Sequence, residues 1–305
     1  MATTKLDRPP LKSPAVSDKP SWLNRRVLVS DARHLESKGI NAYENIGDQP
    51  DLAASIAEHE AAIEAYKQVG IQVEQVPSPE NCQDGVFTAN WGLTWKGRAL
   101  LSRLPNLRQG EEGYAGTVLE ELGFETRRAD ILFSGQGDAL IIGGGRVLIG
   151  DGYRSNAAVG GQIRDWLGLE PVVVRAKPKR RFGFGPPVRN KMTGLWDSYY
   201  YDLDLAVAVI KPDLLAVCFG ALTSQGKAAI HGLTGVEIIP VSEREAKDGL
   251  ACNLVSTEQT VIVSDGAPGL IADIRARGIE VVALPNRQLR KSGGGFRCVS
   301  LSLYQ

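Results

Sequence analysis

The sequence predicts an α/β fold built from five repeated units. A stretch with the apolar spacing of an amphipathic helix occurs five times, and each time a glycine ends it and a short β-branched run follows. A helix commonly ends with a residue at positive φ, which glycine adopts at the lowest cost, and the apolar run after it is then a strand. The five glycines are Gly70, Gly123, Gly168, Gly235 and Gly278.

Strand-like runs also occur in pairs before the helical stretches, so each unit is predicted as strand, strand, helix, strand. One such unit cannot bury its own sheet, but five units closed in a ring can. A doubly wound sheet is the alternative, since it also alternates strands and helices. The hairpin-like pairs argue against it, because parallel crossovers need more residues. The paired runs are 85–87 with 99–101, 139–142 with 146–149, 205–210 with 214–217, and 253–255 with 261–263.

The length of 305 residues and the hydrophobic content of 43% allow one large domain or two ordinary ones. We expect a flexible N-terminal arm over residues 1–24, because its first twenty residues are rich in Pro, Lys, Ser and Asp. Residues 25–305 are expected to form a single domain. The long gap between the third and fourth glycines holds a basic insertion at about residues 177–197. This insertion is either a solvated loop or a lid over an anionic part of a substrate.

The charge balance argues against a nucleic-acid or membrane-surface partner. Lys plus Arg and Asp plus Glu both number 35, and no apolar run approaches the ~20 residues that span a bilayer. The four cysteines form no C-x-x-C pair and only three histidines occur, so we expect no metal. No dinucleotide motif follows a convincing first strand, so we expect no cofactor. Isolated cysteines fit a reducing cytoplasm, and a homodimer is left open.

Cys298 is the candidate chemical centre. It follows Gly293, Gly294 and Gly295, whose lack of side chains allows the backbone close to a ligand. We expect Cys298 at the mouth of a following strand, where a thiol could serve as a nucleophile. A buried, inert thiol is the alternative, since that is the commonest fate of a free cysteine.

The segment Ser-Gly-Gly-Gly-Phe-Arg-Cys-Val-Ser around Cys298 resembles the C-terminal motif of the pentein, or guanidino-group-modifying, superfamily. That superfamily includes dimethylarginine dimethylaminohydrolases, arginine deiminases, arginine dihydrolases and amidinotransferases. The likeness runs from about Arg25 onward and implies a five-bladed αβ-propeller with five ββαβ repeats around a pseudo-five-fold axis. Five further segments resemble its motifs: 84–90 (D-x-V-F-T-A-N), 133–140 (F-E-G-x-G-D-x-L), 154–156 (R-[ST]-N), 201–204 (Y-H-L-D) and 251–253 (A-C-N).

The resemblance implies a cysteine-dependent hydrolase that acts on a guanidino or amidino C–N bond of an arginine-like amino acid. Cys298 would attack the guanidinium carbon and form a covalent intermediate. Asn90 and Asp204 would hold the guanidinium, and Arg154 would bind a substrate carboxylate through its bidentate fork. The remaining substrate-binding positions implied by the motifs are Asp84, Phe87 and Ser134.

Two positions depart from the family pattern. Asp202 stands where the family has its histidine, and Ser134 stands where it has the glutamate that orients that histidine. Asp202 could carry a proton if burial and Asp204 raise its pKa, but a carboxylate near Cys298 disfavours the thiolate. We therefore expect altered or slower chemistry, or none. His34 and His231 are expected to be surface or packing residues.

Three alternatives to hydrolysis remain open at this point. Transfer of the amidino group to another amine would make the chain an amidinotransferase. A non-catalytic pentein would bind an arginine-like ligand without turnover. A biosynthetic enzyme with a less cationic substrate would suit a pocket in which Asn90 and Ser134 replace carboxylates.

Overall fold

The computed structural model describes residues 22–305, whose strands form five separate three-stranded sheets. In each sheet the middle strand pairs antiparallel with one neighbour and parallel with the other. The first sheet joins both ends of this region, since it consists of β15 (Leu301–Ser302), β1 (Arg26–Val29) and β2 (Gln72–Gln75). The α/β class predicted from the sequence is confirmed.

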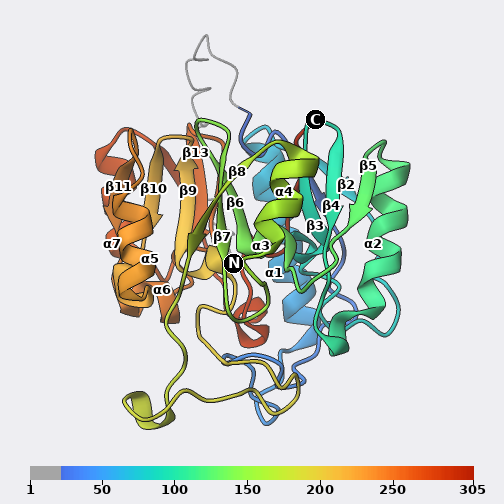
Figure 1. The fold of residues 1–305 in the computed structure, drawn as a ribbon. Helices are drawn as coiled ribbons and strands as arrows, with labels where there is room; N and C mark the ends of the chain where they lie inside the picture. The colour runs from blue at the N-terminus through green and yellow to red at the C-terminus, as the bar shows by residue number, and fades with distance from the viewer. Residues whose placement is uncertain (1–21) are drawn as a thin grey trace, which may run out of the picture.

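The other four sheets each use consecutive strands. They are β3 (Gly92–Trp95), β4 (Arg98–Leu101) and β5 (Glu125–Arg128); β6 (Ala139–Ile142), β7 (Arg146–Gly150) and β8 (Glu170–Val174); β9 (Val207–Lys211), β10 (Leu214–Val217) and β11 (Glu237–Pro240); and β12 (Val255–Ser256), β13 (Thr260–Ser264) and β14 (Glu280–Leu284). One helix per sheet makes the parallel connection: α1 (Leu52–Gln68), α2 (Gly110–Glu121), α4 (Val159–Leu167), α5 (Ser224–His231) and α7 (Pro268–Ala276). In Figure 1, α2 and α5 lie on opposite outer sides with strands between them.

All five predicted glycines lie after the helices and adopt the left-handed conformation. Their φ values are +85° for Gly70, +89° for Gly123, +69° for Gly168, +70° for Gly235 and +73° for Gly278. The outer parallel strand begins two residues after each of them. The helix, glycine, strand pattern is therefore confirmed in every unit. What the pattern did not show is that β15, at the C-terminus, supplies the first strand of the first unit.

The prediction of a strand at 85–87 is wrong. This segment forms turns, with Phe87 N donating to Asp84 O and Asn90 N donating to Phe87 O, and the first strand of that sheet is β3. Val86 and Phe87 are buried against Cys298 and its neighbours, so the apolar run marks burial in a turn. The strand predicted at 253–255 is shorter and begins later in the structure. Only Val255 and Ser256 pair with β13.

The arm predicted for residues 1–24 extends too far. Residues 1–21 lie outside the described part of the chain, while residues 22–24 are packed. Trp22 contacts Trp95 edge-on at 5.6 Å between ring centroids, Leu23 is buried, and Asn24 Nδ2 donates to Ser256 O at 2.8 Å. Partial burial of the Trp22 indole and full burial of Leu23 favour docking over an exposed arm.

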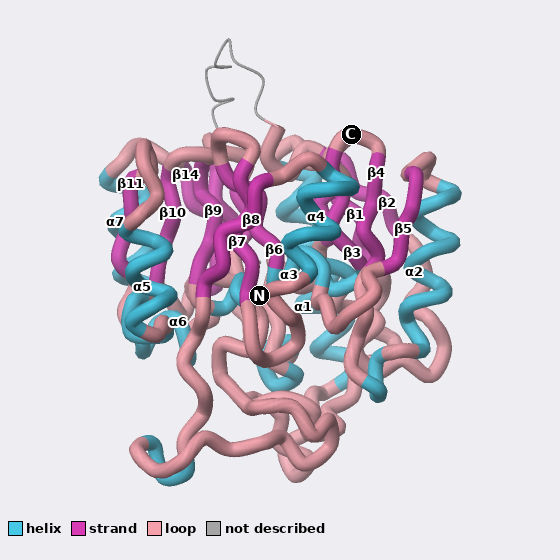
Figure 2. The backbone as a smooth tube through the Cα atoms, viewed as in Figure 1, coloured by secondary structure: helices cyan, strands magenta, loops and turns pink. Residues whose placement is uncertain are grey.

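The insertion at 177–197 extends away from the sheets as a long excursion (Figures 1 and 2). It contains one short turn, η3 (Arg181–Gly183), and two isolated antiparallel bridges, Arg180 with Pro187 and Arg189 with Trp196, but no strand. Asn190 Nδ2 donates to Gly39 O at 2.9 Å, so the insertion lies against the segment 37–46. Within residues 22–305, no helix is long and apolar enough to cross a membrane.

Candidate functional site

A short turn before the first strand of each sheet carries a residue of the site. The turn η1 (Thr88–Trp91) precedes β3, α3 (Gly135–Asp138) follows Ser134 and precedes β6, and η4 (Leu203–Leu205) precedes β9. Asn253 precedes β12 and Cys298 precedes β15 in the same way. Equivalent positions in the five units therefore build one site, although the residues are far apart in the sequence.

Cys298 lies buried in a turn, with 2% of its surface exposed. Its Sγ accepts a hydrogen bond from Asn253 Nδ2 at 3.0 Å and lies 3.5 Å from Asp204 Oδ2, to which the thiol donates. Asn253 Oδ1 also accepts from Cys298 N at 3.1 Å. Asn253 thus fixes both the backbone and the sulfur. The sequence motif around Asn253 was recognised, but no role was predicted for its side chain.

The site holds the Cys298 thiol in its protonated form. Burial is the largest cause, and the Asp204 and Asp202 carboxyls add to it, so the pKa of the Cys298 thiol lies well above its usual range. The Asn253 hydrogen bond acts in the opposite direction. A reaction at this sulfur therefore needs a group that accepts its proton, or a bound cation that favours the thiolate.

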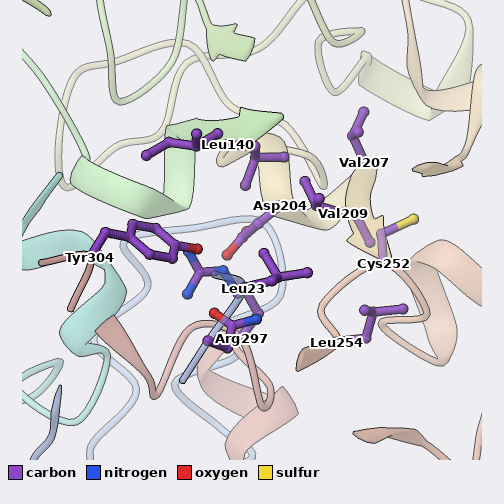
Figure 3. Close-up of a pocket in the computed structure, with 12 residues that line it drawn as sticks. Leu23, Leu140, Asp204, Val207, Val209, Cys252, Leu254, Arg297 and Tyr304 are labelled. Carbon is purple, nitrogen blue, oxygen red and sulfur yellow. The ribbon is translucent and has the colours of Figure 1, made fainter. Parts of the chain in front are cut away.

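Asp204 can exchange a proton near neutral pH. Burial, and then the Asp202 carboxyl, raise the pKa of Asp204 to about 8, while Arg297 and the contact with Cys298 act against that rise. Its Oδ1 is buried and has no hydrogen-bond partner within residues 22–305. Asp204 also faces a cavity of about 20 Å³, enough for one water, whose wall includes Arg297 and Tyr304 (Figure 3).

The two departing positions, Asp202 and Ser134, are joined through Asn90. Asn90 Nδ2 donates to Asp202 Oδ2 at 2.9 Å and to Ser134 Oγ at 2.8 Å. Arg154 Nη1 lies 3.8 Å from the same Asp202 oxygen. Asp202 Oδ1 is buried without a hydrogen-bond partner in the described region, as is Arg154 Nη2. The site therefore offers an unpaired acceptor and an unpaired donor.

Arg108 is the site residue that sequence analysis missed. It is fully buried; its Nε and Nη2 donate to both Glu111 oxygens at 2.7 and 2.6 Å, and its Nη1 donates to Asn90 Oδ1 at 2.6 Å. Because Asn90 Oδ1 accepts this hydrogen bond from Arg108, the amide is oriented with its Nδ2 toward Asp202. Nη2 also donates to Asp84 O at 3.1 Å. Burial raises the pKa of the Asp84 carboxyl to about 6, although Arg108 acts against that rise.

Arg154 and the glycine run are held by aromatic rings. Arg154 Cζ lies 4.1 Å from the ring centroid of Tyr201, whose hydroxyl donates to Gly293 O at 2.7 Å. A Cβ on Gly294 would lie less than 3.0 Å from the Phe87 ring. The close approach predicted for the glycines is therefore an approach to Phe87, which places that ring against the turn that carries Cys298.

Within residues 22–305, no histidine is hydrogen-bonded to Cys298, Asp202 or Asp204. His34 is exposed, and His231 stacks on Phe219 with centroids 4.8 Å apart, as predicted for surface and packing residues. His59 is buried on α1, and burial lowers its pKa to about 4. In the same region no group of three or more His, Cys, Asp or Glu side chains could hold a metal.

Comparisons with known proteins agree with the resemblance found in the sequence. The family model described as N,N dimethylarginine dimethylhydrolase, eukaryotic, matches residues 37–305. The N(G),N(G)-dimethylarginine dimethylaminohydrolase of Mycobacterium tuberculosis is 25% identical over 306 residues, which cover 100% of this chain and 91% of that protein.

Two crystal structures of the N-terminal domain of ArgZ, an arginine dihydrolase from cyanobacteria, are also similar. A cysteine-to-serine mutant bound to substrate gives a TM-score of 0.81 at 25% identity and covers 92% of this chain and 98% of that one. A variant covalently bonded to a reaction intermediate gives 0.78 at 25% identity, with 90% and 96% covered. The predicted kinship with hydrolases of amidine C–N bonds is confirmed. This chain belongs to the dimethylarginine dimethylhydrolase family, within the pentein superfamily.

Proposed function

We propose that the protein hydrolyses a guanidino C–N bond of an arginine-like amino acid through a covalent intermediate on Cys298. The observation that carries this proposal is the buried contact of Cys298 Sγ with both Asn253 and Asp204. In the same buried network, one polar atom each of Asp202, Asp204 and Arg154 has no hydrogen-bond partner within residues 22–305. A substrate with a guanidinium at one end and a carboxylate at the other would pair all three.

Binding of the guanidinium would prepare the nucleophile. Asp202, fixed by Asn90 and close to Arg154, would accept a guanidinium N–H at its free Oδ1. The positive charge would favour the thiolate of Cys298, which burial otherwise disfavours. The same positive charge would lower the pKa of Asp204 from about 8, and the carboxylate so formed would take the proton of the thiol that contacts it. The geometry thus favours Asp204 over Asp202 as the proton carrier.

The reaction then has two halves. The Cys298 thiolate attacks the guanidinium carbon, the C–N bond to the departing amine breaks, and Asp204 returns its proton to that amine. A thiouronium remains on Cys298. Water attacks the same carbon and gives a proton to Asp204, the C–S bond breaks, and the ureido product leaves with the thiol restored. Transfer to a second amine instead of water would be the amidinotransferase reaction.

A second candidate is a binding protein without turnover. The observation in its favour is the raised pKa of the Cys298 thiol together with two carboxyls beside it and no hydrogen-bonded histidine within residues 22–305. It would use the same guanidinium and carboxylate contacts as the enzyme. Product formation therefore separates the two candidates, and binding alone does not.

We also propose that the five sheets close into a five-bladed propeller and that residues 25–305 form one domain. Two observations support this arrangement. The first sheet combines β1 and β15, which come from opposite ends of the described chain. Equivalent turns before the first strand of all five sheets meet at the site. The insertion at 177–197 would then lie near the site, since it contacts Gly39, and Asn41 close by donates to Ser292 O beside the glycine run.

Turnover of L-arginine and of N,N-dimethylarginine by the wild type and Cys298→Ala tests the function. We expect ureido product from the wild type with at least one of them, and none from Cys298→Ala. Cys82→Ala is the matched control, because Cys82 is also a free, buried thiol. This variant should retain activity. Saturable binding with no product from the wild type would favour the binding protein.

A further inference from the structure

A second pocket lies outside the site and has no part in the proposed reaction. Its volume is about 640 Å³, within the usual range for small-molecule sites. It is formed by the start of the insertion, by the two tyrosines that follow the insertion, and by α6 (Glu243–Asp248). Its lining residues include Lys177, Lys179, Arg180, Phe182, Tyr199 and Lys247.

The pocket carries a positive charge. Four cationic side chains line it and Glu243 is the one carboxylate among the lining residues. Lys179 is partly neutralised by Asp197 at 3.3 Å, whereas Lys177 is exposed and has no ion-pair partner within residues 22–305. Lys247 Nζ lies 3.9 Å from the ring centroid of Tyr199. In a chain with a formal net charge of zero, this local excess favours an anionic ligand.

Aromatic rings lie beside these cations. Phe182 is 78% exposed, and its φ of +56° is a costly conformation for a bulky residue. Arg181 lies on its ring at 5.4 Å, and Tyr199 forms part of the pocket wall. An exposed ring next to several cations suits a ligand that combines a flat ring with phosphates, because the ring can stack while the cations bind phosphate oxygens.

A line of tyrosine rings in edge-on contact joins this pocket to the site around Cys298. Tyr199 contacts Tyr43 edge-on at 5.5 Å between centroids, and Tyr43 contacts Tyr201 at 6.4 Å. Tyr201 in turn supports Arg154 at 4.1 Å. A ligand that moves Tyr199 can therefore change the position of the guanidinium that would bind a substrate carboxylate.

We propose that this pocket is an effector site for a phosphorylated small molecule with a flat ring, such as a nucleoside triphosphate, and that its occupation changes the affinity for the arginine-like ligand. The binding part of the proposal is independent of the proposed function. The coupling part rests on that function only in its choice of ligand, L-arginine.

Calorimetric titration of the full chain with ATP, and separately with inorganic triphosphate, tests the binding. We expect ATP to bind more tightly than triphosphate, and the double variant Lys177→Ala/Lys247→Ala to weaken ATP binding by about tenfold or more. Binding should also weaken with added salt. Lys211→Ala is the matched control, since Lys211 is the last residue of β9 and lines a different pocket. Equal affinity in the wild type and the double variant would overturn the site, and equal affinity for ATP and triphosphate would overturn the stacking ring.

Binding of L-arginine to Cys298→Ala, with and without saturating ATP, tests the coupling without any need for turnover. We expect the dissociation constant to change by about fivefold or more, within the usual range of coupling between sites. Tyr43→Leu should keep ATP binding and lose this change. An unchanged dissociation constant in the presence of bound ATP would overturn the coupling, whatever the wild type does to the substrate.

Discussion

The turn around Cys298 and the insertion at 177–197 are both irregular backbone, yet they are stabilised in opposite ways. The turn is buried, and its backbone and the Cys298 side chain are fixed by two hydrogen bonds with Asn253 and by packing against Phe87. The insertion exposes Phe182 and Phe184 at 78% and 85% and is held mainly by its own backbone. Irregular backbone at the site is therefore rigid because of what packs on it, whereas the insertion is free to respond to a ligand.

The largest difference in stability between the site and the insertion is expected when the buried Arg108 is replaced. Arg108→Met leaves Glu111 buried without its partner and frees Asn90 Oδ1, so we expect a loss of about 3–5 kcal/mol in the free energy of unfolding. Arg189→Met in the insertion should cost less than about 1 kcal/mol, because Arg189 makes only exposed contacts, a stack on Trp196 and one hydrogen bond to Gly194 O. Urea denaturation measures both. Similar losses would show that the insertion is as rigid as the site.

Loss of the Asn253 side chain should slow the reaction. Asn253→Ala removes the hydrogen bond to Sγ, which is worth about 1.5–3 kcal/mol if the sulfur is charged in the transition state, so kcat should fall by about 10- to 100-fold. Asn190→Ala is the matched change in the insertion. It removes only neutral hydrogen bonds, namely the one to Gly39 O and those that Oδ1 accepts from Met192 and Thr193. Its kcat should fall less than about tenfold. Steady-state kinetics with the better substrate distinguishes the two.

The glycine run should tolerate no side chain where Phe87 packs. Gly294→Ala would place a Cβ against that ring, and such overpacking typically costs about 1–3 kcal/mol. Gly161→Ala on α4 meets no atom within 4 Å and should stabilise the helix by about 0.5–1 kcal/mol. Thermal unfolding of the two variants should therefore shift in opposite directions. A stable Gly294→Ala variant would mean that the turn is as loose as the insertion.

Asp204 should make stability depend on pH. Its pKa is raised from 3.8 in an ordinary carboxyl to about 8, so the folded protein keeps a proton that the unfolded chain releases. This contribution to stability is fully present below about pH 4 and is lost as the pH rises through about 8, at up to about 1.4 kcal/mol per pH unit. Asp204→Asn should flatten the slope between pH 5 and 8, whereas Asp213→Asn, at an exposed carboxylate, should not.

The sequence predicted those parts of the fold that depend on local conformation. The five glycines after the helices were identified because positive φ is a local requirement, and Cys298, Asn90 and Asp204 were placed together by resemblance to a family. Arg108 was missed because Asn90 and Asp84, which place it in the site, meet it only through tertiary packing. At the start of a helix, Arg108 and Glu111 look like ordinary surface charges.

The errors have the same origin. The run at 85–87 has the composition of a strand, but it is apolar because it packs on Cys298 and Leu289. Residues 22–24 follow a polar, proline-rich stretch, but Trp22 finds Trp95 and Tyr304. In both cases the distant surface that buries the segment is visible only in the folded chain.

The central claim is that Cys298 forms a covalent intermediate with a guanidino substrate, and trapping that intermediate tests it most directly. The wild type would be mixed with L-arginine or N,N-dimethylarginine, quenched in acid within the first turnovers, digested and examined by mass spectrometry. The account predicts an amidino adduct on the peptide that contains Cys298, and none on Cys82, Cys218 or Cys252. Ureido product that accumulates in undiminished amount from Cys298→Ala, with no adduct on the wild type, would contradict it.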